Sequence, residues 1–159
     1  MATTFAIFTA LENDPPSSAY ATLAIRTTGV SVLKFAQSVI SGTVFKGMIP
    51  SGFGLATMNI TIWWASNTAT TGAVVWGAAI DNSTSHSIDT DSYGAQSTTT
   101  TTTNAVAAKP SSTVITITTG NQQSLAVEQP FKLQIQRVGT NGSDTMADTA
   151  SIEMIEVSM

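Results

Sequence analysis

The most informative stretch of the sequence reads Leu55-Ala-Thr-Met-Asn-Ile-Thr-Ile-Trp-Trp-Ala65. From Met58 to Trp64 every second side chain is large and apolar, whereas the side chains between them are mostly polar. Successive side chains of a β-strand point to opposite faces of its sheet, so this alternation gathers the apolar ones on one face. The stretch therefore predicts an antiparallel strand with Trp64 in the core and Trp63 exposed.

Further strand patterns follow on both sides of this one. Residues 73–80 alternate in the same way with Trp76 facing inward, and we expect them to pair with the first strand. The other expected strands cover residues 5–11, 21–26, 30–35, 43–49, 114–118, 131–137 and 150–159. Six consecutive threonines at 98–103 favour a strand over a linker, because β-branched residues suit an extended backbone. A short helical turn is expected only at 125–129.

These elements predict an all-β fold. Short strands separated by turn residues are typical of an antiparallel β-sandwich, and a jelly roll of about eight strands with very little helix fits the length. We expect one domain in which residues 41–159 form the sandwich core. Residues 1–40 would add an N-terminal arm or edge strands to the same domain.

The composition narrows the range of functions. The chain has 159 residues, a net charge of −4, no cysteine, one histidine and 27 threonines. The absence of cysteine excludes disulfides and thiolate chemistry, and the few scattered lysines and arginines argue against nucleic acid or membrane partners. No apolar run is long enough for a membrane span, and the start of the chain lacks a signal-peptide pattern. The sequence predicts a protein made in the cytoplasm, without cofactor or metal.

One polar loop collects the side chains that could take part in chemistry or ligand binding. The candidate ligand residues are Asp81, His86, Asp89, Asp91 and Tyr93. A Ser-His-Asp arrangement is nominally available, but no G-x-S-x-G motif accompanies it, and an exposed loop histidine is the simpler interpretation. Carboxylates at alternate positions could also ligate calcium. The loop lacks the glycine and glutamate of a calcium-binding loop, however, so Asx-type turns are the simpler interpretation here too.

The last expected strand differs from the others because neither of its faces is polar. Ile152 and Met154 fall on one side, and Ile155, Val157 and Met159 lie nearer the other. A strand of this kind either is central in a sheet or contacts a neighbouring subunit.

Several of these patterns together resemble a known group of proteins. They are Val44-Phe-Lys-Gly-Met-Ile-Pro50, Met58-Asn-Ile-Thr-Ile-Trp-Trp-Ala65, Val75-Trp-Gly-Ala-Ala-Ile80, Asp89-Thr-Asp-Ser-Tyr93, Pro130-Phe-Lys-Leu-Gln-Ile-Gln-Arg137, Asn141-Gly-Ser-Asp-Thr-Met146 and Ile152-Glu-Met-Ile-Glu-Val157. Over residues 40–159 the chain resembles the small β-sandwich modules that tailed bacteriophages carry in virion proteins, on capsids or in tail appendages. The shared patterns are strands and turns, not catalytic motifs.

This resemblance implies a structural protein of the virion surface, made in the host cytoplasm. The first expectation is a non-enzymatic capsid decoration or cement protein, trimeric, that binds the major capsid protein and stabilises the shell. Its expected contact residues are Thr3, Phe5, Ile7, Phe8, Trp63, Ile155, Val157 and Met159. The alternative is a tail-fibre or host-recognition module whose loops at 67–72 and 81–93 bind glycan. A glycan hydrolase ranks third, because no spacing selects a pair of catalytic carboxylates.

Overall fold

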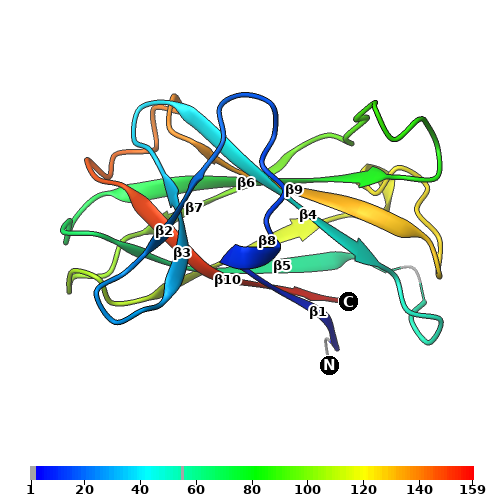
Figure 1. Ribbon diagram of the computed structural model, residues 1–159, viewed down its shortest axis with the longest axis horizontal. Coiled ribbons are helices and arrows are strands. Elements are labelled where there is room, and N and C mark those ends of the chain that lie inside the picture. Colours follow the sequence, from blue (N-terminus) through cyan, green and yellow to red (C-terminus); the bar gives the residue numbers. More distant parts are fainter. Residues whose placement is uncertain (1–2, 55) are drawn as a thin grey trace.

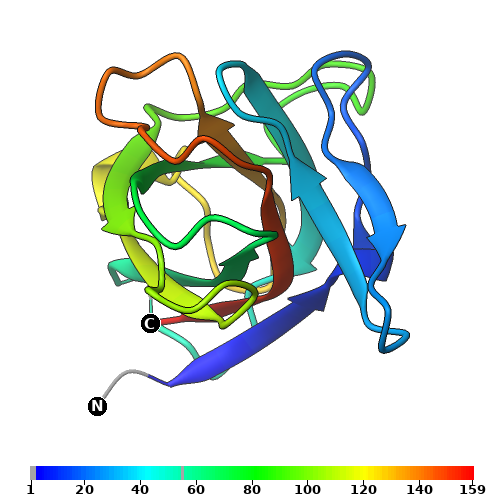
Figure 2. The same ribbon diagram turned by 90° about the vertical axis from the view of Figure 1, so that its left-hand side faces the viewer.

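Two antiparallel sheets face each other across one core in the computed structural model, which describes residues 3–54 and 56–159 (Figures 1 and 2). Sheet A contains β1 (Thr4–Thr9), β2 (Thr22–Ile25), β3 (Ser31–Phe35), β5 (Met58–Ser66), β8 (Ser111–Ile117) and β10 (Ala150–Ser158). Sheet B contains β4 (Ile40–Met48), β6 (Ala73–Asn82), β7 (Ser97–Thr102) and β9 (Pro130–Val138). The helices are two short 3₁₀ turns, η1 (Ala10–Glu12) and η2 (Thr119–Asn121). None of the described helices has the length or apolar character to cross a membrane.

The all-β sandwich with very little helix is therefore confirmed, with ten strands instead of about eight. The order is β2-β3-β10-β5-β8 in sheet A, with β1 also paired to β10, and β4-β9-β6-β7 in sheet B. The strand over the threonine run is confirmed as β7. The predicted start of the β5 strand at Leu55 lies outside the described residues.

The inward faces of the two sheets form a core that contains large aromatic side chains. Trp64 and Trp76 are both buried, and their rings meet edge to face at 5.9 Å. Trp64 Nε1 donates a hydrogen bond of 2.9 Å to Thr113 Oγ1, and Phe35 packs against Trp76 with ring centroids 5.0 Å apart. Aromatic pairs in this arrangement add about 0.5–1.5 kcal/mol each beyond the burial of their surface. The prediction that both tryptophans lie in the core is confirmed.

The predicted pairing of β5 with β6 is wrong. β5 pairs with β10 and β8 in sheet A, whereas β6 pairs with β9 and β7 in sheet B. Residues 67–72 carry the chain from one sheet to the other. Each strand turns an apolar face inward, and the sandwich sets those two faces opposite each other across the core; β6 is buried on its other face as well.

β10 is a central strand, which is one of the two outcomes that its sequence predicted. It pairs with β1 and β3 along one edge and with β5 along the other. An irregularity in its pairing with β5 between Ile152 and Met154 shifts the alternation by one residue, so both Ile152 and Ile155 face the core. Backbone hydrogen bonds of 2.7 and 3.2 Å between Thr3 and Met159 hold the two chain ends side by side.

The predicted helical turn at 125–129 is wrong. The nearest helix is η2, which ends at Asn121, and residues 125–129 form turns without helix. Glu128, in the middle of this segment, has a φ of 60°, a backbone conformation that a right-handed helix does not contain.

Arg137 points into the protein, where it anchors the loop between β9 and β10. Its guanidinium donates to both carboxylate oxygens of Asp144, at 3.0 and 2.7 Å, and both side chains are buried. It also donates to the backbone carbonyls of Met146 at 2.8 Å and Asp148 at 2.5 Å. We call this set of contacts, Arg137 with Asp144, Met146 and Asp148, the arginine clamp.

Candidate functional site

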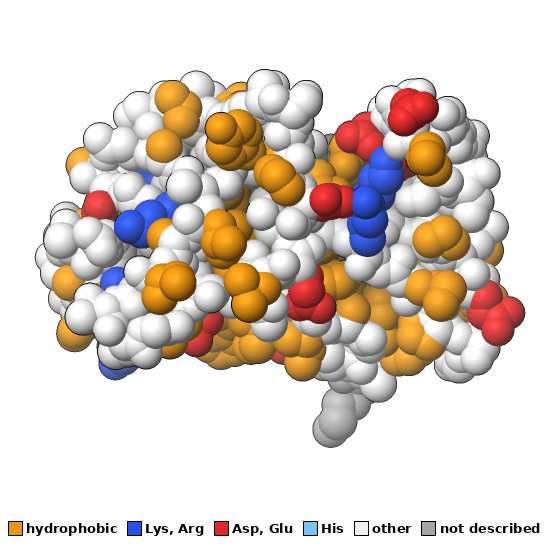
Figure 3. Space-filling model, viewed as in Figure 1, with side chains coloured by type: hydrophobic (Ala, Val, Ile, Leu, Met, Phe, Trp, Pro, Cys, Tyr) orange, Lys and Arg blue, Asp and Glu red, His pale blue; other side chains and the backbone are white. Residues whose placement is uncertain are grey.

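A groove runs over the outer face of sheet B, between two loops that project beyond the sheet. One wall is the N-terminal loop around Asp14, Pro15 and Pro16, and the other is the loop that follows β6. Figure 3 shows the surface on this side of the molecule, with a hollow in which basic side chains lie between acidic ones. We refer to this feature as the sheet B groove.

Two lysines form the floor of the groove. Lys46 on β4 lies directly opposite Lys132 on β9, and like charges in that position destabilise a sheet. Each lysine has an acidic partner from one wall: Lys46 pairs with Asp14, and Lys132 Nζ lies 2.6 Å from Asp91 Oδ1. Both aspartates are more than half exposed. Lys46 is also exposed, whereas the Lys132 side chain is only 14% exposed and lies opposite the buried Asp81 on β6.

The space around these lysines is divided into two parts. A cavity of about 230 Å³ lies between the N-terminal loop and Asp91, and a second of about 340 Å³ lies between Phe131 and the tip of the β6–β7 loop. Both cavities include Lys46 and Lys132, so they meet at the lysine pair. The second is the more apolar and includes Ile88, one of the most exposed apolar side chains described.

Asp81, His86 and Ser85 form a hydrogen-bonded chain at the base of the β6–β7 loop. His86 Nε2 lies 3.1 Å from Asp81 Oδ2, and His86 Nδ1 lies 2.9 Å from Ser85 Oγ. The Ser85 hydroxyl also donates to the backbone carbonyl of Asn82, at 2.8 Å. The Asp81 carboxylate accepts from His86 Nε2, and the single Ser85 hydroxyl proton has two acceptors within reach, His86 Nδ1 and the carbonyl of Asn82. These contacts fasten the loop to the end of β6.

Two buried polar atoms beneath the same loop have no hydrogen-bond partner among the described residues. They are Asp81 Oδ1 and the hydroxyl oxygen of Tyr93. Burial, followed by the negative charges of Asp91, Asp81 and Asp14, raises the pKa of Tyr93 above its ordinary value. The Tyr93 hydroxyl therefore stays protonated and remains available as a donor.

The structure brings together four of the five loop residues that the sequence singled out. Asp81, His86, Asp91 and Tyr93 lie along one wall of the groove or beneath it, whereas Asp89 is exposed and makes no side-chain contact with them. No cluster of three or more acidic, histidine or cysteine side chains in the described ranges could hold a metal ion.

Sequence reasoning missed the other half of the site. Asp14, Pro15, Pro16, Tyr20 and Lys46 come from the first third of the chain, where strand patterns were the weakest. Tyr20 is 58% exposed and lies in a shallow cavity that shares both prolines with the groove. The only sequence signal for Lys46 is its place in the alternation of β4, between the inward Phe45 and the buried Ile49.

The expected contact residues of the virion interpretation fall into two groups. Phe8, Ile155 and Val157 are buried within the sandwich because β10 is central, so these three side chains offer no free surface, which corrects that part of the expectation. Phe5 and Met159 pack partly against the core. Thr3 is exposed, Ile7 is 54% exposed and Trp63 is 37% exposed, all in sheet A or at its edge.

Comparisons with known proteins concern the fold. No protein-family model matches the sequence, and no curated protein matches it either. A family 35 carbohydrate-binding module from an environmental isolate superposes with a TM-score of 0.60 at 12% identity, covering 96% of this chain and 92% of that one. The CBM22-1 xylan-binding domain of Paenibacillus barcinonensis Xyn10C gives 0.52 at 6% identity, covering 98% and 94%.

A third match shows the same sandwich within a larger protein. The arabinose-bound α-L-arabinofuranosidase MgGH51 aligns with a TM-score of 0.54 at 14% identity, and 92% of this chain covers 23% of that enzyme. None of these three structures is described as a virion protein, so the bacteriophage origin stays a prediction. At these identities the comparisons concern architecture alone, and the chain has the β-sandwich fold that carbohydrate-binding modules have.

Proposed function

We propose that this protein is a non-catalytic carbohydrate-binding module and that the sheet B groove holds a glycan chain. The observation that carries the proposal is the groove itself, an open channel lined by paired lysines and aspartates on a sandwich of the carbohydrate-binding kind. This corresponds to the glycan-binding alternative that the sequence suggested, without its placement in a phage tail.

The groove supplies the two kinds of contact that a sugar needs. Lys46 and Lys132 donate hydrogen bonds, and Asp14 and Asp91 accept them, so adjacent hydroxyls of a sugar ring can be bound from both sides. Charged donors and acceptors make stronger hydrogen bonds than neutral ones. The side chain of Ile88 and the prolines offer apolar surface to the C–H faces of the ring.

Exposed ion pairs suit this role because they cost little to rearrange. The Lys46–Asp14 pair, exposed on both sides, contributes roughly 0–1 kcal/mol, so a ligand can take over its hydrogen bonds without destabilising the fold. In the second pair Asp91 is the exposed member and can turn from Lys132 toward a ligand. The groove is open at the top, which lets it accept the interior of a chain as well as its end.

The test is a binding screen with matched variants. The purified protein is run in native gels that contain soluble polysaccharides, and oligosaccharides of any that retard it are titrated by calorimetry. Lys132→Ala is expected to weaken binding about tenfold or more, as loss of a charge-assisted hydrogen bond predicts. Lys34→Ala is the control, since Lys34 is an exposed lysine on the outer face of sheet A.

Two outcomes would overturn this proposal. The first is that no polysaccharide in a panel of neutral and acidic glycans retards the protein. The second is that Lys132→Ala and Lys34→Ala bind a glycan as tightly as the unaltered protein, which would place the ligand outside the groove.

The second candidate function is the capsid decoration role, which one observation favours. Ile7, Trp63 and Val114 are exposed on the outer face of sheet A, in two adjacent cross-strand rows that also include Met154. Such a surface suits association with a second copy or with a major capsid protein, on a virion assembled in the host cytoplasm. Light scattering of the purified protein would report a trimer, which Trp63→Arg should dissociate. Mass spectrometry of purified particles would give its copy number relative to the capsid protein.

A further inference from the structure

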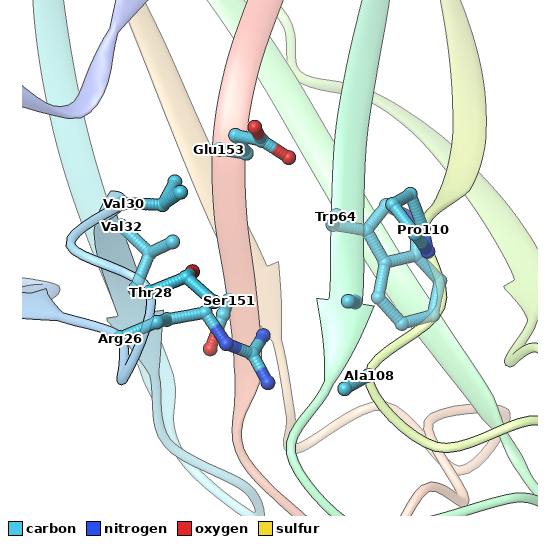
Figure 4. Close-up of a pocket in the computed structure, with 10 residues that line it drawn as sticks. Arg26, Thr28, Val30, Val32, Trp64, Ala108, Pro110, Ser151 and Glu153 are labelled. Carbon is cyan, nitrogen blue, oxygen red and sulfur yellow. The ribbon is translucent and has the colours of Figure 1, made fainter.

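A second cavity lies on the other side of the sandwich, over the outer face of sheet A where β10 begins. It has a volume of about 280 Å³. Its floor is made of the small side chains Ser151 and Ala65, which are neighbours in register. Figure 4 shows its walls: the β2–β3 turn with Arg26 on one side and the segment before β8 with Pro110 on the other. We call it the sheet A pocket.

Two opposite charges face this pocket. Arg26 extends from the β2–β3 turn across Ser151 toward the middle of the space, and Glu153 projects from β10 above it (Figure 4). Neither side chain forms an ion pair or a side-chain hydrogen bond within the described part of the chain. By contrast, Lys46, Lys132 and Arg137 each have a carboxylate partner.

The other walls are apolar. Val30, Val32 and Pro110 line the sides, and Val32 is almost fully buried. Apolar walls keep water away from part of the bound ligand and strengthen the electrostatic interactions within the pocket. A separated cation and anion in such surroundings suit a ligand that has both charges.

We propose that the sheet A pocket binds a small zwitterion, a molecule with a carboxylate and an ammonium group a few bonds apart, as in a free α-amino acid. The Arg26 guanidinium binds the carboxylate in the two-pronged geometry that this pair favours, and the Glu153 carboxylate accepts hydrogen bonds from the ammonium group. Ser151 Oγ at the floor can donate to the carboxylate, and Val30 and Pro110 contact the side chain of the ligand.

Ligands with a single charge fit less well. A simple anion would be attracted by Arg26 but repelled by Glu153. A simple cation would be attracted by Glu153 but repelled by Arg26. The volume of about 280 Å³ accommodates one amino acid. This site is therefore independent of the sheet B groove in both position and ligand.

The test uses ¹H–¹⁵N NMR of the full chain with probes of defined charge. Titration with alanine and valine is expected to shift the backbone resonances around Ser151 and Val30, whereas acetate and methylamine at equal concentration should not. Arg26→Gln and Glu153→Gln should each weaken binding roughly tenfold or more. Lys34→Gln, which neutralises an exposed lysine next to Ser151 on the same face, should leave the affinity unchanged.

Each contrary result rejects the proposal in a defined way. No shift with either amino acid at millimolar concentration would exclude the site. If acetate bound as tightly as the amino acids, the pocket would be an anion site at Arg26. If glucuronate bound more tightly than the amino acids, the partner of Glu153 would be sugar hydroxyls instead of an ammonium group. Melting temperatures of the variants will show whether they are folded, and Lys132→Ala should not alter amino-acid binding.

Discussion

Strand β9 carries two positively charged residues five positions apart, and they have opposite roles. Arg137 and Asp144 are almost wholly inaccessible, at 0% and 1% side-chain exposure, and every nitrogen of the guanidinium donates a hydrogen bond. Lys132 points to the outer face, where its side chain is 14% exposed, and its Nζ pairs with one carboxylate oxygen of Asp91, which is 52% exposed. The same kind of ion pair thus secures the fold at one end of the strand and lines an open groove at the other.

Burial decides whether an ion pair can give up one partner. Removing one member of a buried pair leaves the other charged in a poorly polar environment, which costs about 3–5 kcal/mol. Removing one member of an exposed pair leaves the other in water, at a cost of about 1 kcal/mol or less. Only the exposed pair can exchange its partner for a ligand.

The largest expected effect comes from breaking the arginine clamp. Arg137→Ala should lower the free energy of unfolding by about 3–5 kcal/mol, because Asp144 and the carbonyls of Met146 and Asp148 lose their donor. Urea denaturation followed by tryptophan fluorescence measures the change. If the loss were below 1 kcal/mol, the clamp would be no more important to the fold than the groove pairs. The double variant Arg137→Met, Asp144→Leu should recover part of the loss, since it leaves no unpaired charge.

A somewhat smaller effect is expected at Gly72, which lies against the clamped loop. Its φ is +93°, and a Cβ built on it would lie 2.7 Å from the Cα of Met146. Gly72→Ala should therefore cost roughly 1–3 kcal/mol, from backbone strain and from displacement of the 145–146 segment. Gly142→Ala is the control, because a Cβ there has open space around it. Similar melting temperatures for the two variants would contradict the tight packing at this end.

A pH effect is expected at Asp148, beside the clamp. Burial acts to raise the pKa of its carboxyl, but backbone N–H groups of Thr68, Ala69 and Thr149 donate to it at 2.6, 3.0 and 2.7 Å, and the net effect is a pKa below the ordinary 3.8. A lowered folded-state pKa adds stability that is fully present above pH 3.8 and is lost as the pH falls through the folded value. Asp148→Asn should flatten the fall in melting temperature below pH 4. An unchanged slope would show that other carboxylates cause it.

The smallest expected effect on stability is at the groove. Lys132→Ala and Asp91→Ala should each lower the free energy of unfolding by about 1 kcal/mol, the upper end for a surface pair because the Lys132 side chain is only 14% exposed, with the difference shrinking at high salt. The same denaturation curves used for Arg137→Ala measure this, so the contrast between the two ends of β9 is read from one experiment. A loss of 3 kcal/mol at Lys132 would mean that the groove pair supports the fold and is not free to exchange partners.

The sequence predicted the parts of this comparison that depend on local alternation. In the predicted strand at 131–137, alternation places Phe131, Leu133 and Ile135 on one face and Lys132 on the other, and the structure buries the first three. Arg137 continues the inward phase of the same strand, and Asp144 follows within one loop. Alternation therefore places a charged residue in the core, but it does not identify the carboxylate that neutralises it.

The groove was only half predictable, for a physical reason. Asp81, His86, Asp91 and Tyr93 belong to one loop, so the sequence alone brings them together. Lys46 and Lys132 meet only because β4 pairs with β9 in a register set by the whole sandwich, across 86 positions of chain. The mistaken pairing of β5 with β6 has the same origin, since alternation predicts a strand but not the sheet that it joins.

The position of the chain ends has a practical consequence. Thr3 and Met159 are held together by reciprocal backbone hydrogen bonds in sheet A, and the groove opens from sheet B on the other side. A linker attached to either end would leave from the same corner of the molecule, so a surface or enzyme coupled there would not cover the groove. The adjacent ends also make the domain suitable for circular permutation, or for grafting as a whole into a loop of another protein, with little change to its own hydrogen bonds.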